Sequence, residues 1–455
     1  MRIEEDFLGK VKIEDDAYYG AETERALENF KISGITVSKY FIKHYAYLKL
    51  SMAKANMKIG KLNKEKGDAI VKACREIIEG KHDKEFKLDI FQAGAGTSTN
   101  MNLNEVIANR ATELLKGKKG SYIVNPNDDV NMAQSTNDTY HSAMHISLLM
   151  KTIELLEELE RFERSIEEKA KEFRPIVKVG RTHLQDAVPI SLGSEFEGYA
   201  GSLGMAKEVI RGAANMLRSL PIAGTAVGTG INAQKELRPI VCEILSKELK
   251  QRFFPSKNIF AVMQNVNEEL VLSNSLLFLG VVLSKISNDL RLLGSGPRGG
   301  IGEIIIPPVQ PGSSIMPGKV NPSMLEMLNM VCFHVIGSCT TVEHAAISSQ
   351  LELNVFMPIV SQHLLFSESI LASALRSVRE KCIKGIKANE KRIKEILDND
   401  LGMATALSPY IGYAKASEIA LKAYREGKTI KEVCLEMGIM KKEELERVLD
   451  PKKQL

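Results

Sequence analysis

The chain has 455 residues, of which 44% are hydrophobic and 26% are charged, which is the balance of an ordinary globular protein. This composition excludes an intrinsically disordered or fibrous protein. The formal net charge is only +4, which is too small to predict a nucleic-acid-binding surface. Tryptophan is absent, so aliphatic side chains must fill most of the interior.

Three features of the sequence predict the cellular compartment: the N-terminus, the apolar runs and the cysteines. Three of the first six residues are acidic, and this segment lacks the order of a signal peptide. The longest uncharged runs, 270–284, 327–342 and 353–367, fall short of a membrane span. The six cysteines include no CxxC pair and lie too far apart for a disulfide framework. We therefore expect a cytoplasmic protein with no membrane contact.

In chain order, short helical patterns broken by glycines come first, and we expect an N-terminal domain over 1–138. A central domain over 139–392 follows, in which apolar residues recur at helical spacing. Charge density then rises, with Gly402 and Gly412 as breaks, which predicts a small helical domain over 393–455. The long helices expected in the central domain are 142–173, 194–220, 262–293, 322–346 and 355–386.

Three of these helices carry the uncharged runs and are apolar on nearly every face. A helix that is hydrophobic all round must be buried on all sides, and a bundle of five helices exposes each helix to water somewhere. We therefore expect other subunits to cover them.

Four polar, glycine-rich segments interrupt the helical pattern: 94–100, 134–138, 180–186 and 312–322. The last three directly precede predicted long helices, whose N-termini favour anions, so a carboxylate is the expected ligand. Helix capping alone would explain any single segment. The fourth segment is typical of a loop that closes over a small anion. It is no nucleotide loop, because Val320 follows Lys319 where a P-loop has Ser or Thr.

The run GSSIMPGKVNP at 312–322 resembles the signature of the fumarase/aspartase superfamily. AYYG at 17–20, GRTHLQDAVP at 180–189 and IGY at 411–413 resemble further motifs of that family, in the family's order. The resemblance implies a mainly all-α fold with small N- and C-terminal domains around a long-helix bundle. It also implies a homotetramer with a shared twenty-helix core, whose active sites are each built from three subunits.

The reaction that this resemblance implies is a reversible anti elimination from a small dicarboxylate, giving fumarate through an aci-carboxylate dianion. Ser313 matches the family's base. Lys319 and Asn321 match residues that hold the substrate carboxylate, and His183, paired with Glu326 in the fumarase branch, matches a group beside the leaving group. The other implied substrate contacts are Thr97, Ser98, Asn100, Ser135, Thr136, Asn137, Thr182 and Ser314.

Two branches of the family compete. GAGTSTN, QSTND and AYYG resemble aspartate ammonia-lyases, a class of carbon–nitrogen lyase, where fumarases tend to carry GTQ, QSSND and YWG. PRGGIGEI, LELNVF and IGYAKASEIALKAYREG resemble fumarate hydratases, which are carbon–oxygen lyases. Substrate contacts decide specificity, and they favour the aspartase branch.

A non-catalytic helical assembly protein is the third alternative, and the intact set Ser313, Lys319, Asn321 and His183 argues against it. No cofactor and no metal site are expected, although the sequence leaves open activation by a divalent cation such as Mg²⁺.

His141 and His145 are four residues apart on one predicted helix, as in a metal-binding pair. No Glu or third ligand accompanies them in the sequence, so we expect a surface or subunit-contact role. His141 departs from the family pattern, in which Pro usually follows the aromatic residue at position 140.

Overall fold

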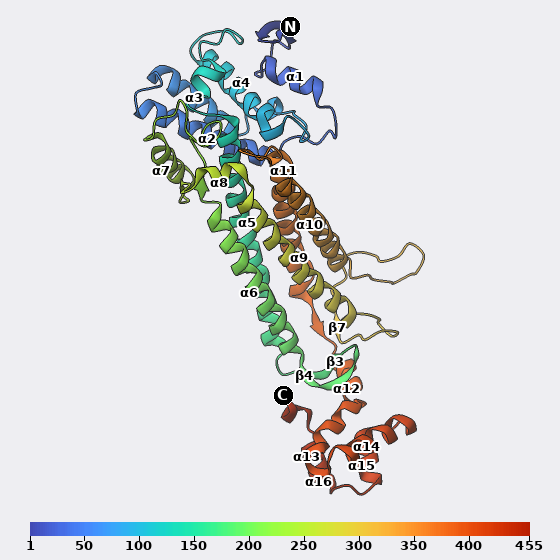
Figure 1. Ribbon diagram of the computed structural model, residues 1–455. Helices are drawn as coiled ribbons and strands as arrows, with labels where there is room; N and C mark the ends of the chain where they lie inside the picture. Colours follow the sequence, from blue (N-terminus) through green and yellow to red (C-terminus); the bar gives the residue numbers. More distant parts are fainter. The chain divides into compact units, whose positions relative to one another are not determined.

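The computed structural model describes residues 1–455 and divides into two compact units. Unit 1 consists of Met1–Leu156, Glu208–Phe278 and His334–Ile370, and unit 2 of Glu157–Lys207, Leu279–Phe333 and Leu371–Leu455. Helices dominate both units, and strands occur only in two-stranded sheets, so the expected mainly all-α fold is confirmed (Figure 1). This division does not test the predicted domain boundaries after residues 138 and 392, which stay a prediction.

The N-terminal part of unit 1 is a cluster of shorter helices beside a hairpin of β1 (Arg2–Asp6) and β2 (Gly9–Ile13). Side chains cap two of the helices, since Ser38 accepts a hydrogen bond from the Tyr40 amide and Asn63 accepts two from the next turn. The helices are α1 (Ala21–Asn29), α2 (Lys39–Lys58), α3 (Lys64–Ile78), α4 (Thr97–Leu114) and α7 (Leu237–Leu249).

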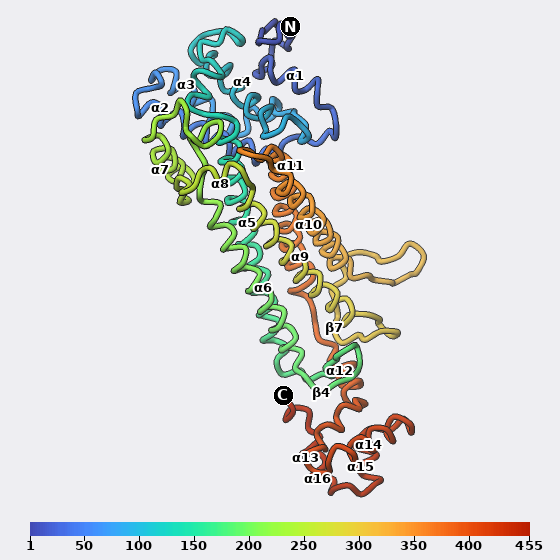
Figure 2. Tube along the Cα trace, viewed as in Figure 1, coloured from blue at the N-terminus to red at the C-terminus, as the bar shows by residue number.

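The predicted long-helix bundle is present, and segments of it belong to each unit (Figure 2). The expected helix 262–293 is in fact two helices, because Asn265 is extended and its side chain bonds to the Ala261 carbonyl. The long helices begin or end up to six residues from the predicted positions. They are α5 (Thr136–Phe173), α6 (Leu192–Met216), α9 (Asn267–Leu293), α10 (Ser323–Ile347) and α11 (Met357–Lys381), with the short α8 (Ile259–Gln264) before α9.

The bundle core is mainly aliphatic, as expected in a chain without tryptophan, with phenylalanines among the aliphatic side chains. On α5, Leu148, Leu155, Phe162 and Phe173 recur at helical spacing and are all but fully buried. Each such side chain contributes about 1.5 to 3 kcal/mol when it leaves water. All six cysteines are free and buried, as expected for small apolar fillers.

Unit 2 also contains a hairpin and a C-terminal cluster of short helices. The antiparallel strands β3 (Val177–Thr182) and β4 (Gln185–Ser191) form the hairpin. Leu407, Ile419 and Val433 belong to a separate core within residues 401–449. The C-terminal helices are α12 (Glu390–Asp398), α13 (Ser408–Ile411), α14 (Tyr413–Glu426), α15 (Ile430–Glu436) and α16 (Lys442–Val448). Two short strand pairs remain: β5 (Ser219–Leu220) with β6 (Phe254–Pro255) in unit 1, and β7 (Ile304–Ile305) with β8 (Lys387–Ala388) in unit 2.

Large apolar side chains on α6 and α10 are exposed in the single chain. A soluble monomer rarely leaves so many uncovered. On α10 this agrees with the expectation that other subunits cover the three apolar helices, whereas the exposed side chains of α6 were not predicted. The tetramer itself stays a prediction. The most exposed of these side chains are Met205 (63%), Met330 (64%), Phe333 (60%) and Ile347 (78%).

Two helices, α9 and α10, are long and apolar enough by length and composition to cross a membrane, with mean hydropathies of 1.8 and 1.3. The uncharged runs themselves are shorter, and the two helices reach this length because they extend beyond those runs. About half of each apolar window is buried within the chain (56% and 44%). A core helix of a soluble protein passes the same test, and the absence of membrane contact stays a prediction.

Candidate active site

In unit 1, a tight turn presents Thr97 at the start of α4. Ala95 and Gly96 both have left-handed backbone conformations, with φ of 60° and 81°. A Cβ on Gly96 would lie 2.2 Å from the ring of Tyr140, so only glycine fits there. Thr97 is exposed beyond this turn, whereas Ser98 and Asn100 are buried. Of the three, Thr97 is thus the residue that faces solvent in the single chain.

Asn100 joins α4 to the start of α5 in the interior. Its side-chain oxygen accepts a hydrogen bond from the Tyr45 hydroxyl at 2.7 Å. Its amide nitrogen donates to the Thr136 hydroxyl at 3.0 Å, and Thr136 is only 8% exposed. Asn100 and Thr136 therefore brace one another, and their predicted contact with substrate stays a prediction.

Ser135 and Asn137 are half-buried at the N-terminus of α5, as the sequence predicted. The Ser135 amide donates to the Asp138 carboxylate at 2.9 Å, and the Asn137 side chain donates to the Ala226 carbonyl at 2.8 Å. The second Asp138 oxygen accepts from the Thr225 amide at 3.2 Å. Burial raises the pKa of Asp138 to about 7. These bonds fix the start of the helix against the loop near Thr225.

Beneath these polar residues lies a buried cation that sequence reasoning missed. Lys49 of α2 is 1% exposed and donates to the side-chain oxygens of Asn131 (3.0 Å) and Gln134 (2.9 Å). Burial lowers the pKa of its ammonium to about 7. One lysine among several on α2 gives no sequence signal, because only the fold shows which one points inward.

In unit 2, the loop 312–322 is closed at its base and holds the predicted base in a turn. The Gly312 amide donates to the Lys319 carbonyl at 2.7 Å, and the Asn321 side chain donates to the Gly312 carbonyl at 2.8 Å. The Ser313 hydroxyl oxygen accepts hydrogen bonds from the backbone amides of Ile315 (3.2 Å) and Met316 (2.9 Å). Two N–H groups thus point at the oxygen that would carry negative charge in a serine base.

The exposed Lys319 side chain belongs to the same loop. Ser313 and Lys319 line one hollow of about 580 Å³. Lys319 and Asn321 line a second hollow of about 320 Å³. The loop therefore places a hydroxyl, a cation and an amide beside open space that can admit a small dicarboxylate. Ser314 is exposed in the same loop.

The segment 180–186 forms the turn of the β3–β4 hairpin, so the expectation that it opens a helix was wrong. Residues 177–191 alternate as a strand pair, and α6 begins only at Leu192. Thr182 and His183 are exposed at the turn, and His183 and Leu184 have φ of 56° and 60°. Such conformations cost non-glycine residues about 1 kcal/mol or more each, and they cluster at functional sites.

A buried ion-pair group supports this hairpin. Glu303, fully buried, lies 2.9 Å from Arg181 and 3.0 Å from Lys178. Lys178 also contacts Glu195 on α6 at 2.8 Å. Glu326, by contrast, is half-buried in the first turn of α10. The pairing of His183 with Glu326 stays a prediction.

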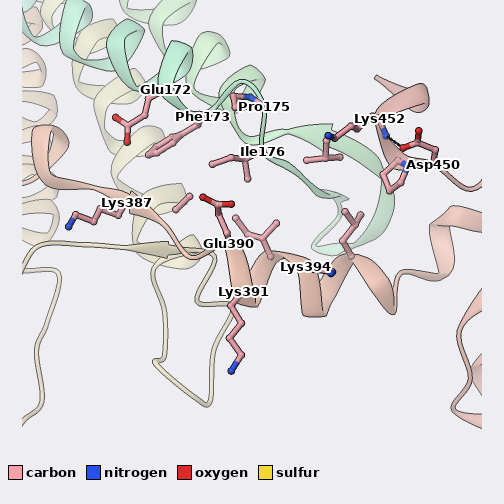
Figure 3. Close-up of a pocket in the computed structure, with 15 residues that line it drawn as sticks. Glu172, Phe173, Pro175, Ile176, Lys387, Glu390, Lys391, Lys394, Asp450 and Lys452 are labelled. Atoms are coloured by element: carbon pink, nitrogen blue, oxygen red, sulfur yellow. Dashed lines mark hydrogen bonds between the residues drawn. The ribbon is translucent and has the colours of Figure 1, made fainter.

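A larger hollow of unit 2, about 900 Å³, contains none of the predicted site residues. It lies among the end of α5, the start of β3, α12 and the C-terminal residues, and Figure 3 shows Lys391 directed away from it. Its charged lining mixes Glu390 and Asp450 with Lys387 and Lys452, so no single ligand charge is favoured.

His141 and His145 are not at a surface, so that expectation was wrong. Both are fully buried, and their Nε2 atoms lie 3.1 and 2.9 Å from one oxygen of Glu269 on α9. The missing third residue lies far away in sequence and meets the pair only in the folded bundle. The sequence around Glu269 contains no pattern that predicts this contact.

Comparison with known proteins covers the whole chain. A family model described as "Lyase" matches residues 9–337, and one described as "Fumarase C C-terminus" matches residues 403–453. The chain is 46% identical to an aspartate ammonia-lyase of Bacillus sp., with 99% of this chain and 97% of that protein covered. It is 44% identical to a class II fumarate hydratase of Bacillus subtilis, with 99% and 98% covered.

Solved structures agree with these matches. A fumarate lyase:delta crystallin from Brucella melitensis bound to cobalt superimposes with a TM-score of 0.96 at 43% identity, covering 100% of this chain and 99% of that one. A recombinant class II fumarase from Schistosoma mansoni gives a TM-score of 0.97 at 37% identity, covering 99% and 98%. The two kinds of curated relative thus match this chain about equally well.

Proposed function

The chain belongs to the fumarase/aspartase superfamily of lyases, and from that premise we propose that it is an aspartate ammonia-lyase. The reaction is the reversible anti elimination of ammonia from L-aspartate to give fumarate. The observation that carries this proposal is the pair of segments GAGTSTN and QSTND at 94–100 and 134–138. Ser98 and Thr136 stand where the fumarase pattern has Gln and Ser.

In the proposed mechanism, Ser313 removes a proton from the aspartate carbon that carries the side-chain carboxylate. The electrons of the broken C–H bond move into that carboxylate and give an aci-carboxylate dianion. Collapse of the dianion forms the carbon–carbon double bond and breaks the C–N bond, and ammonia leaves. Because the carbon acid is very weak, stabilisation of the dianion must supply most of the catalysis.

The surroundings of Ser313 support its role as a base. A serine hydroxyl is normally a poor base, because its alkoxide is a high-energy anion. The backbone amides of Ile315 and Met316 already donate to the Ser313 oxygen, and hydrogen bonds to an anion are about twice as strong as those to a neutral group. Lys319, in the same loop, adds a positive charge that holds a substrate carboxylate together with Asn321.

The other predicted site residues that reach the surface of the single chain include two groups. Thr97, Ser135 and Asn137 lie at helix N-termini of unit 1, where backbone N–H groups and the helix dipole favour a carboxylate. Thr182 and His183 form the exposed hairpin turn of unit 2 and are assigned to the leaving ammonia. We assign these groups to active sites built from three subunits of a homotetramer, a proposal supported by the exposed apolar faces of α6 and α10.

A class II fumarate hydratase is the second candidate. It is favoured by the C-terminal match at residues 403–453 and by a 45% identity to the class II fumarate hydratase of Helicobacter pylori over the whole chain. In that reaction the same base acts on L-malate and water leaves in place of ammonia.

One assay separates the two candidates. The purified protein is incubated with L-aspartate and, separately, with L-malate, and fumarate formation is followed by its ultraviolet absorbance. We expect fumarate from L-aspartate, with and without EDTA in parallel arms that report on activation by Mg²⁺. Turnover of L-malate alone would overturn the proposal in favour of the hydratase, and a folded tetramer inert towards both would indicate the non-catalytic alternative.

A further inference from the structure

A fully buried cluster in unit 1 takes no part in the proposed elimination. His141 and His145, one helical turn apart on α5, direct their Nε2 atoms at one oxygen of Glu269 on α9, at 3.1 and 2.9 Å. The ligand atoms of the three side chains all lie within 4.8 Å of one another. All three residues have 0% exposure.

The hydrogen bonds of the cluster set its protonation. His145 Nδ1 lies 2.8 Å from the Ser219 carbonyl oxygen, which can only accept, so this nitrogen carries a proton. In a neutral His145 the Nε2 atom therefore offers a lone pair towards the Glu269 carboxylate, which is itself an acceptor. Two acceptors facing each other at 2.9 Å require a shared cation between them, either a proton or a metal ion.

Several polar atoms of the cluster lack partners. His145 Nε2, Glu269 Oε2 and His141 Nδ1 are buried and make no hydrogen bond of acceptable geometry. Leaving a buried polar atom unpaired is costly, so each such group calls for a ligand or a structural reason. The unpaired Nε2 and Oε2 atoms point to a coordinating ion.

The geometry points to His141, His145 and Glu269 as a binding site for a divalent transition-metal ion of the Zn²⁺ or Co²⁺ class. Two imidazoles at positions i and i+4 with one carboxylate are a frequent ligand set for such ions. Mg²⁺ and Ca²⁺ prefer oxygen ligands, so this site is distinct from any activation by Mg²⁺. The contact of His145 with the Ser219 carbonyl is the outer hydrogen bond that typically orients a metal-bound imidazole.

The competing explanation is a proton in place of the metal. Although burial opposes charge on His145, the Glu269 carboxylate raises the pKa of that imidazole. Although burial also opposes charge on Glu269, the two imidazoles hold its pKa well below the usual range. A buried imidazolium–carboxylate pair would then replace the metal site, and metal content separates the two.

The experiment uses the full chain without a histidine tag, produced in minimal medium supplemented with Co²⁺ so that the ion is present as the protein folds. After dialysis against EDTA to remove surface-bound metal, cobalt is measured by mass spectrometry and by visible absorption. We expect about one Co²⁺ per chain, with the intense absorption of four- or five-coordinate cobalt. Wild-type protein that holds no cobalt would overturn the proposal and leave the ion pair.

Variants locate the ion. Glu269→Gln keeps the shape of the side chain but removes its charge, and His141→Ala removes one imidazole. Each should lower bound cobalt by roughly 10-fold or more, with folding checked by circular dichroism and gel filtration. His334→Ala, which removes an exposed imidazole elsewhere in unit 1, should retain the ion. Equal cobalt in the wild type and in folded Glu269→Gln protein would refute the assignment.

Discussion

A single methyl group added at Gly96 should disturb the candidate site. In Gly96→Ala the new Cβ would meet two ring carbons of Tyr140 at 2.2 Å, whereas carbon atoms in contact normally lie about 3.5 to 4.0 Å apart. Tyr140 cannot swing aside freely, because its ring is 1% exposed, packs against Phe41 and is tied to the Ser361 hydroxyl at 3.1 Å.

Two terms set the expected magnitude. The left-handed backbone at φ 81° costs an alanine about 1 kcal/mol. Pushing the ring away costs about 1 to 3 kcal/mol more, the usual range for overpacking a core. Gly96→Ala should therefore destabilise the protein by about 2 to 4 kcal/mol. Because Thr97 follows directly, we also expect the Michaelis constant for L-aspartate to rise.

Gly427→Ala is the matched control. Gly427 also has a left-handed backbone, with φ 63°, but nothing lies within 4 Å of its Cβ position. It isolates the backbone term, about 1 kcal/mol. Urea unfolding followed by circular dichroism, at one protein concentration for all variants, gives the two shifts. If Gly96→Ala shifts the midpoint no more than Gly427→Ala does, the clash with Tyr140 does not lower the stability, which would refute the prediction.

Three further predictions follow from the same structure. Ser313→Ala should abolish fumarate formation while gel filtration shows an unchanged assembly; a wild-type rate would mean that another group is the base. Lys319→Met should lower kcat/KM for L-aspartate by about 2 to 5 kcal/mol, or roughly 30- to 5000-fold, and unchanged kinetics would remove Lys319 from the site. His44 is buried, and burial lowers its pKa from 6.5 to about 4. The folded state therefore resists protonation there, so stability present above pH 6.5 should be lost as the pH falls towards 4, by up to about 3 kcal/mol. Urea unfolding between pH 4 and 7 should show a shallower pH dependence for His44→Gln, and identical slopes would contradict this account.

The long helices could be predicted from the sequence because their apolar spacing records the burial of one face. The start of α5 was predicted six residues late, since most of its first residues are polar yet buried, among them Thr136, Asp138 and His141. The break between α8 and α9 was missed because it depends on one asparagine side chain, that of Asn265, which donates to the Ala261 carbonyl of the preceding turn.

The candidate catalytic loop at 312–322 could also be predicted from the sequence, as could the polar start of α5. The hairpin at 177–191 was not, since its strands are short and their register shifts between Val179 and Arg181, which weakens the alternation of a strand pair. Contacts between distant segments were beyond reach: Glu269 joins His141, and Lys49 supports Gln134, only after the helices have packed. Sequence periodicity identifies which face is buried but not which residues meet there.

The closed base of the loop at 312–322 has a consequence for how an active site of this kind switches on. Gly312 is hydrogen-bonded to both Lys319 and Asn321, so the loop between them forms a closed ring. Ser313 and Lys319 lie on opposite sides of the point where the ring closes. A hinge outside the ring would swing Ser313 and Lys319 together. The proposed base and the proposed carboxylate-binding cation would then reach or leave the substrate at the same time, and a site holding only one of them would be rare.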